Sequence, residues 1–327
     1  MVFVDGKTLG WSVVPRCFLL SVILLSVVSS LMATTTPARA ALVYEYVAGS
    51  SPDDGSDTVW EASVENPSFP RNWSLSGATF GATFLANAGS SHAGISSAYS
   101  FSGSSSGGAN PSSFGSPGFP LGGAAGNDEG ASTAWEIWVR PSAATLDAIG
   151  DETLFETGGD AAGGHLAFVA ATGGVTLRFR TGQSVLGNVT TATVDASLTD
   201  NSLLNDFMQI VGVVDPSATQ MRLYVNGSLV GSEGSFKDWQ GGNNASGLGR
   251  LNGTFGGANG VTAGAGNFAG DIARLSLYDD ALSDAEVSQL YTTVVTVPEP
   301  TSQALFLLGL GVGVAVRHAR RRRHRGA

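Results

Sequence analysis

The acidic residues closest to a catalytic spacing lie in the segment 151–156, which has the sequence Asp-Glu-Thr-Leu-Phe-Glu. Hydrolysis of a glycosidic bond with retention needs two carboxyl groups about 5 Å apart, one acting as nucleophile and one as acid. Side chains alternate along a strand, so Glu152, Leu154 and Glu156 are expected to share a face. We interpret the segment as a strand end with a solvated acidic edge rather than a catalytic pair.

Side chains that could serve as nucleophile or base are few. Residues 103–107 fit the Gly-x-Ser-x-Gly pattern, but that pattern requires a preceding strand and a following helix, and here it lies in low-complexity sequence. Between residues 41 and 296 the histidines are His92 and His165, without the His-Glu-x-x-His spacing of a zinc site. The single cysteine, Cys17, precedes this region. We predict no catalytic residues and a protein that is not an enzyme.

The region 41–296 is strongly acidic. It holds 25 Asp and Glu against eight Lys and Arg, which leaves a net charge of −17. Such a surface argues against nucleic acid or anionic lipid as a partner and is compatible with solubility or with divalent cations.

The clearest element is expected within residues 206–226. Residues 207–214 are almost all apolar and rich in β-branched side chains, which is typical of a strand covered on both faces. Residues 221–225 alternate between apolar and polar, and the Asp-Pro-Ser sequence at 215–217 favours a turn. The stretch predicts a central antiparallel hairpin.

Further short strands are expected on both sides of this hairpin. Residues 134–140 alternate strongly, with Trp135 on one face and Glu136, Trp138 and Arg140 on the other. The other expected strands lie at 42–47, 59–64, 78–85, 98–101, 154–157, 165–170, 174–180 and 267–278.

The remaining segments are expected to be loops and one helix. Residues 102–130 are rich in Ser, Gly and Pro and predict a long surface loop, 187–205 predicts a polar connection, and 241–266 predicts loops with at most one short strand. Ser283 and Glu286 have capping-box spacing at the start of an amphipathic helix. The pattern predicts an all-β fold: a two-sheet antiparallel sandwich with one short C-terminal helix.

Residues 1–40 have the features of an N-terminal signal peptide. Positive charge precedes an apolar core of 11 residues at 18–28, and Ala38 and Ala40 provide a small-x-small cleavage site before Ala41. An uncleaved anchor would need about 20 apolar residues, so we expect cleavage.

The C-terminal region contains a short hydrophobic helix and a basic end. The apolar run at 304–316 holds 13 residues, enough for a helix of roughly 20 Å against a hydrocarbon layer of about 30 Å. The basic cluster consists of Arg317, Arg320, Arg321, Arg322, Arg323 and Arg325. The segment is expected to enter the membrane at least transiently, with the arginines on the cytoplasmic side. A short retained anchor with snorkelling arginines is the alternative.

The C-terminal region resembles the bacterial PEP-CTERM sorting signal, because Pro298-Glu299-Pro300 is followed by an apolar segment and then by a basic end. The resemblance covers about 30 residues. It implies that these three residues are recognised by an exosortase, a membrane transpeptidase-like enzyme that cuts nearby and releases or transfers the protein. The implied partners are this enzyme and the secretion machinery, and the implied location is the cell envelope, the cell surface or the extracellular space.

Five segments resemble the laminin-G-like, concanavalin A-like jelly-roll domain: 98–103, 134–141, 154–159, 224–227 and 270–291. The resemblance implies one jelly-roll domain over 41–296 that contains the 102–130 loop, between a signal peptide at 1–40 and a sorting signal at 297–327. Some such domains bind calcium at the rim of the sandwich through an aspartate that precedes a strand. Asp160 holds a comparable place, and calcium takes six to eight oxygen ligands.

Three functions are compatible with these features. The first hypothesis is an exported, non-catalytic surface or matrix protein that binds carbohydrate, such as extracellular polysaccharide, or surface proteins. The second is a glycoside hydrolase or lyase on the same fold, and the third is a purely structural surface protein. Fold resemblance alone does not select a ligand.

Overall fold

The computed structural model divides the chain into two units, residues 1–39 and 40–327. All residues with a described structure belong to the second unit. They are 40–50, 52–53, 55, 59–64, 72–75, 82–103, 108–109, 132–146, 151–157, 163–171, 174–185, 188–198, 205–236, 246–250 and 267–296. The description below refers to these residues.

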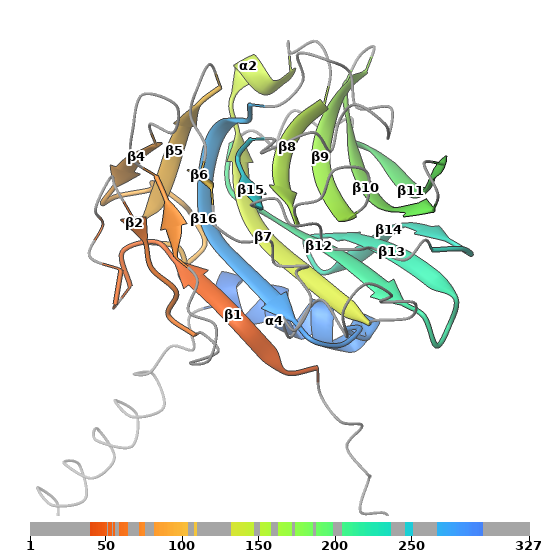
Figure 1. The fold of residues 1–327 in the computed structure, drawn as a ribbon. Helices are drawn as coiled ribbons and strands as arrows, with labels where there is room; N and C mark the ends of the chain where they lie inside the picture. The colour runs from red at the N-terminus through yellow and green to blue at the C-terminus, as the bar shows by residue number, and fades with distance from the viewer. Residues whose placement is uncertain are drawn as a thin grey trace, which may run out of the picture. The chain divides into compact units, whose positions relative to one another are not determined.

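The described residues form two antiparallel sheets, A and B (Figure 1). The strands of sheet A, in spatial order, are β14 (Ser228–Glu233), β13 (Gln220–Val225), β12 (Met208–Asp215), β7 (Thr133–Pro141), β16 (Ala269–Tyr278), β5 (Ala98–Ser102) and β4 (Ala82–Leu85), and β1 (Leu42–Val47) also pairs with β16. The strands of sheet B are β11 (Asn188–Leu198), β10 (Gly174–Val185), β9 (Gly163–Ala171), β8 (Asp151–Glu156), β15 (Gly247–Leu248), β6 (Gly108–Ala109), β3 (Trp73–Ser74) and β2 (Val59–Trp60).

The predicted central hairpin is confirmed as β12 and β13. Its register pairs Ile210 with Val225 and Asp215 with Gln220. The following turn at Asn226 and Gly227 has φ values of 50° and 74°, the left-handed conformation that two-residue hairpin turns require. The hairpin continues into the edge strand β14.

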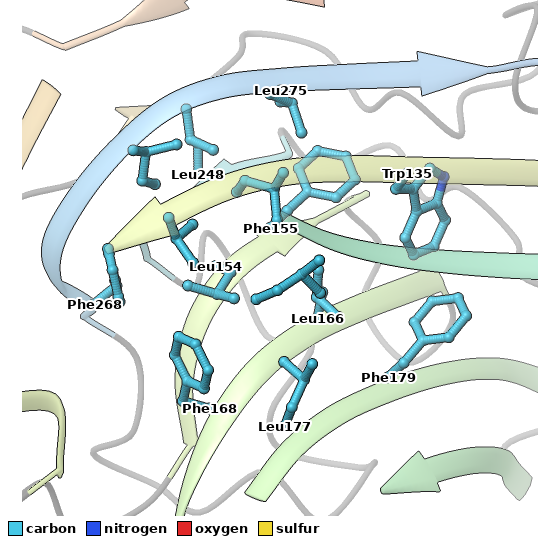
Figure 2. Packing of buried hydrophobic residues seen from close by; sticks show 14 of the residues in the cluster. Trp135, Leu154, Phe155, Leu166, Phe168, Leu177, Phe179, Leu248, Phe268 and Leu275 are labelled. Atoms are coloured by element: carbon cyan, nitrogen blue, oxygen red, sulfur yellow. The ribbon is translucent and has the colours of Figure 1, made fainter. Parts of the chain in front are cut away.

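The two sheets meet in an aromatic core. Trp135 of β7 points from sheet A toward sheet B, and its ring lies 5.5 Å from Phe155 and 5.2 Å from Phe179, both edge-on (Figure 2). Edge-to-face geometry suits aromatic pairs because the positive ring edge meets the negative ring face. The predicted alternation of β7 is confirmed, because Ile137 and Val139 join the same core.

Some local expectations were wrong. The segment 187–205 was expected to be a polar connection, yet residues 188–198 form β11 and pair with β10 over their whole length. Ala192, Val194 and Ala196 are buried against the core, so the alternating Thr and Val residues mark a half-buried strand. Within the expected 102–130 loop, Gly108–Ala109 form β6. An unpredicted one-turn helix, α2 (Ala143–Leu146), follows β7.

The helix α4 (Asp284–Val295) covers part of the outer face of sheet A. Its predicted capping box is confirmed, since Ser283 Oγ accepts from the Glu286 amide and Glu286 Oε2 accepts from the Ser283 amide. Val287 packs with outward side chains of sheet A, and the Tyr291 ring stacks on Trp138 at 5.8 Å. No helix within the described residues is long and apolar enough to cross a membrane, and the segment 304–316 lies outside those residues.

A buried carboxylate lies on the outer face of sheet A. Glu136 is 3% exposed. It accepts hydrogen bonds from Trp138 Nε1 at 2.9 Å, Gln209 Nε2 at 2.7 Å and Tyr278 Oη at 2.9 Å. The pKa of the Tyr278 hydroxyl lies well above its usual range because of burial and, next, the Glu136 charge. The network joins β7, β12 and β16. It supplies the Glu136 carboxylate, which water does not reach, with hydrogen bonds from the protein.

We predict that Glu136→Ala lowers the free energy of unfolding by about 3–5 kcal/mol, because it leaves three buried donors without their acceptor. Glu136→Gln keeps an acceptor of the same shape, and its amide can donate to the Tyr278 hydroxyl, so a cost of about 1 kcal/mol or less is expected. Urea unfolding of the three proteins measures both values. Equal losses for the two variants would contradict the assigned hydrogen bonds.

Candidate functional site

A polar row crosses the outward face of sheet B. Register places Glu156 of β8 opposite His165 of β9, His165 opposite Arg180 of β10, and Arg180 opposite Thr193 of β11. Directly paired residues point to the same side of a sheet, and the alternating neighbours Leu166 of β9 and Phe179 of β10 belong to the core. Glu156, His165 and Arg180 are buried.

A second group lies beside this row and is more exposed. It begins at Thr193, the partly exposed end of the row, and also includes Thr176, Arg178, Asp195 and Ser197 on β10 and β11. We call it the outer strip. Arg178 Nε and Nη2 donate to the two oxygens of Asp195 at 2.6 and 2.7 Å. These two side chains remain 24% and 41% exposed. Each carboxylate oxygen has more than one lone pair, so Asp195 can still accept hydrogen bonds from ligand hydroxyl groups while it is paired with Arg178.

His165 is held in its neutral form. Its Nε2 lies 3.0 Å from Thr153 Oγ1, and the side chain is fully buried. Burial, and then the positive charges of Arg180 and Arg178, lowers the pKa of His165 to about 3. A general base works best with a pKa near the operating pH, so this histidine is unsuited to proton transfer at neutral pH.

The acidic segment 151–156 does not form a carboxylate pair. A bulge between Thr153 and Phe155 shifts the register, so the expectation that Glu152 and Glu156 share a face was wrong. Glu156 pairs with His165 on the outward face, whereas Glu152 accepts from the Ala269 amide at 3.4 Å. Burial raises the pKa of Glu152, opposed by a hydrogen bond from Thr145. The carboxylates of Glu152 and Glu156 therefore lie in different environments and do not face each other.

Several expected site residues lie outside the described residues: Asp160, Ala38, Pro298, Glu299, Pro300 and the arginines from Arg317 to Arg325. Ala40 and Ala41 are described. Ala40 is buried in the same hydrophobic cluster as Leu282, and the Ala41 amide donates to Asp279 Oδ1 at 2.8 Å. The described residues hold no group of three or more His, Cys, Asp or Glu placed to bind a metal.

The comparison with protein families identifies the class of the protein. A model of the concanavalin A-like lectin/glucanases superfamily matches residues 116–288, and a model of the PEP-CTERM protein-sorting motif matches residues 296–323. The chain belongs to the concanavalin A-like lectin/glucanases superfamily and carries a PEP-CTERM sorting motif. It is an exported protein of the cell envelope, the cell surface or the extracellular space. No match was found among the curated proteins.

Solved structures with similar folds share little sequence with this chain. The botulinum neurotoxin serotype G binding domain has 17% identity and a TM-score of 0.43, over 67% of this chain and 48% of that one. Domain 4 of AbnA, an extracellular arabinanase from Geobacillus stearothermophilus, in complex with arabinotriose, has 17% identity and a TM-score of 0.43, over 77% and 99%. CBM40 of the Ruminococcus gnavus IT-sialidase, bound to alpha2,3 sialyllactose, has 18% identity and a TM-score of 0.37, over 50% and 84%. The match to the crystal structure of HCR/D-Sa-GBL1/C covers 36% of that protein's chain. This chain therefore spans only part of the length of some of the solved structures that it matches.

We predict a pH-dependent stability that His165 controls. The unfolded chain binds a proton at this residue near pH 6.5, whereas the folded chain does so only near pH 3. The contribution of His165 is therefore fully present above about pH 6.5 and is lost as the pH falls toward 3, by up to about 1.4 kcal/mol per pH unit.

Urea unfolding of wild type and His165→Gln at pH 7 and pH 5 measures this contribution. Wild type is expected to lose about 2 kcal/mol more than the variant between the two pH values. The same pH dependence in both proteins would show that His165 is not held neutral.

Proposed function

We propose that this protein is a non-catalytic carbohydrate-binding protein of the cell surface or extracellular matrix. An exosortase-type enzyme would process its sorting motif, and the jelly-roll domain would contact an extracellular glycan. Membership of a superfamily that contains lectins supports the binding role. The observation that carries the proposal is the outer strip, where exposed hydrogen-bonding side chains lie beside a histidine and a glutamate that are buried.

The alternative of a hydrolase or lyase on this fold is less well supported by the described residues. Retaining hydrolysis needs paired carboxyl groups about 5 Å apart. Glu152 and Glu156, the candidate pair in the 151–156 segment, lie on opposite sides of sheet B. His165 is buried, with its pKa near 3, so it does not supply an accessible base.

The processing proposal concerns both ends of the chain. Removal of residues 1–40 would leave Ala41 as the first residue, with its α-amino group beside Asp279. At the other end, 304–316 would enter the membrane until an exosortase-type enzyme acts near Pro298-Glu299-Pro300. The surrounding motif matches the family model at residues 296–323.

Glycan binding is tested with a glycan array probed by the purified exported protein, with and without calcium. Arg178→Ala combined with Asp195→Ala is expected to lower affinity for a retained glycan at least about 10-fold, since each charged hydrogen bond contributes about 1.5–3 kcal/mol. Arg274→Ala, which removes an ion pair of similar exposure on β16, is the matched control and should bind like wild type.

The same array separates the alternatives. Release of new reducing ends would indicate a hydrolase, and absence of all glycan binding would favour a purely structural protein. If binding requires calcium, Asp160→Ala should abolish that requirement or the binding itself.

Sorting is tested by replacing Pro298 and Glu299 with Ala. The double variant is expected to retain its C-terminal segment and to accumulate in the membrane fraction, because the processing enzyme would lose its recognition motif. Thr301→Ala, directly after the motif, serves as the control. Intact-mass analysis and fractionation report the outcome, and unchanged processing in the double variant would indicate an ordinary tail anchor.

A further inference from the structure

A groove lies on the outer face of sheet A, at the end of the sheet near α2. Its volume is about 360 Å³, and its lining includes Ser100, Phe101, Arg140, Pro141, Ser142 and Asp271. Ligand pockets range from roughly 300 to 1,000 Å³, so this volume suits a small ligand or the end of a larger one. The groove belongs to the opposite sheet from the outer strip.

Three strands bring polar side chains together in this groove. Asp271 of β16 is directly opposite Ser100 of β5 on one side and Arg140 of β7 on the other. Directly paired residues share a face, so the hydroxyl, carboxylate and guanidinium form one row across the sheet. The same face carries Trp138 and Glu136 further along β7.

The ion pair in this row leaves hydrogen-bonding capacity toward the groove. Arg140 Nε and Nη2 both donate to Asp271 Oδ2, at 3.0 and 2.7 Å. In the part of the chain that the structure describes, Asp271 Oδ1 and Arg140 Nη1 have no hydrogen-bond partner. The guanidinium lies 4.8 Å from the centre of the Phe207 ring, so its position is fixed from a second side. The two side chains are 21% and 14% exposed, and their charges compensate each other.

Ser142 supplies a second independent observation. Its backbone amide donates to the Ala269 carbonyl at 2.9 Å, which sets the direction of the chain as it leaves β7. Its Oγ is buried and has no hydrogen-bond partner among the described residues. Burying a hydroxyl without a partner costs about 1–3 kcal/mol. The residue as a whole is only partly buried, so a change of rotamer would bring the hydroxyl to the groove, where a ligand could supply that partner.

We propose that this groove binds a neutral polyhydroxylated ligand, such as one or two sugar units of a glycan. Asp271 Oδ1 would accept from one ligand hydroxyl, and Arg140 Nη1 would donate to a neighbouring one. Ser142 Oγ, after rotation toward the groove, would gain the partner that it lacks. A neutral ligand is favoured because the ion pair has no net charge and the 41–296 region carries −17. The inference does not depend on the outer strip, which belongs to the other sheet.

The test titrates the exported protein with neutral monosaccharides and with uronic acids at millimolar concentration, and follows binding by ligand-observed NMR. Neutral sugars are expected to bind. Asp271→Asn should weaken them about 10-fold or more, as expected for loss of a hydrogen bond to a charged group. Glu45→Gln, which changes the carboxylate of an ion pair of similar exposure outside both the groove and the outer strip, is the matched control and should leave sugar binding unchanged.

Ser142→Ala separates binding from folding. The variant removes a hydroxyl without a partner, so the melting temperature of the free protein is expected to stay the same or rise, while sugar affinity falls several-fold. No binding of any neutral sugar, preference for uronic acids, or affinities unchanged by both Asp271→Asn and Ser142→Ala would overturn the proposal. Sensitivity to Asp195→Asn with insensitivity to Asp271→Asn would also overturn it and would leave the outer strip as the binding surface.

Discussion

Strand β7 has almost no contact with solvent, and much of the sandwich is arranged around that constraint. Thr133 to Val139 are all buried, so one face of the strand enters the core between the sheets and the other lies under covering structure. Polar groups in such a strand must find their hydrogen bonds inside the protein. Glu136 does so through Trp138, Gln209 and Tyr278, which belong to β7 and its two neighbours in sheet A. The network thus ties together the three central strands of sheet A.

The same constraint makes the two outer faces of the sandwich different. On sheet A, α4 and the residues before it cover Ala134 and the strands around it, so the groove lies further along, at Arg140. On sheet B, the outward residues change from the buried Glu156, His165 and Arg180 to the more exposed outer strip on β10 and β11. Both surfaces contain an arginine paired with an aspartate, which suits neutral ligands better than polyanions.

Local pattern was enough to predict the sandwich but not the contacts between distant strands. The alternation of 134–140 and the spacing of Ser283 and Glu286 predicted β7 and the start of α4, because each signal depends only on neighbouring residues. β11 was missed because alternating Thr and small apolar residues resemble a polar connection. The bulge in β8 and the alignment of Ser100, Asp271 and Arg140 depend on pairing between strands far apart in sequence, which periodicity does not reveal.

The central claim is that the jelly-roll domain binds glycan without cleaving it. A crystal structure of the exported protein, soaked for a long period with an oligosaccharide selected by binding, tests this most directly. The account predicts an intact oligosaccharide in contact with Arg178 and Asp195 on the outer strip or with Arg140 and Asp271 in the groove. A cleaved oligosaccharide, or an oligosaccharide bound between two carboxylates elsewhere in the molecule, would contradict it.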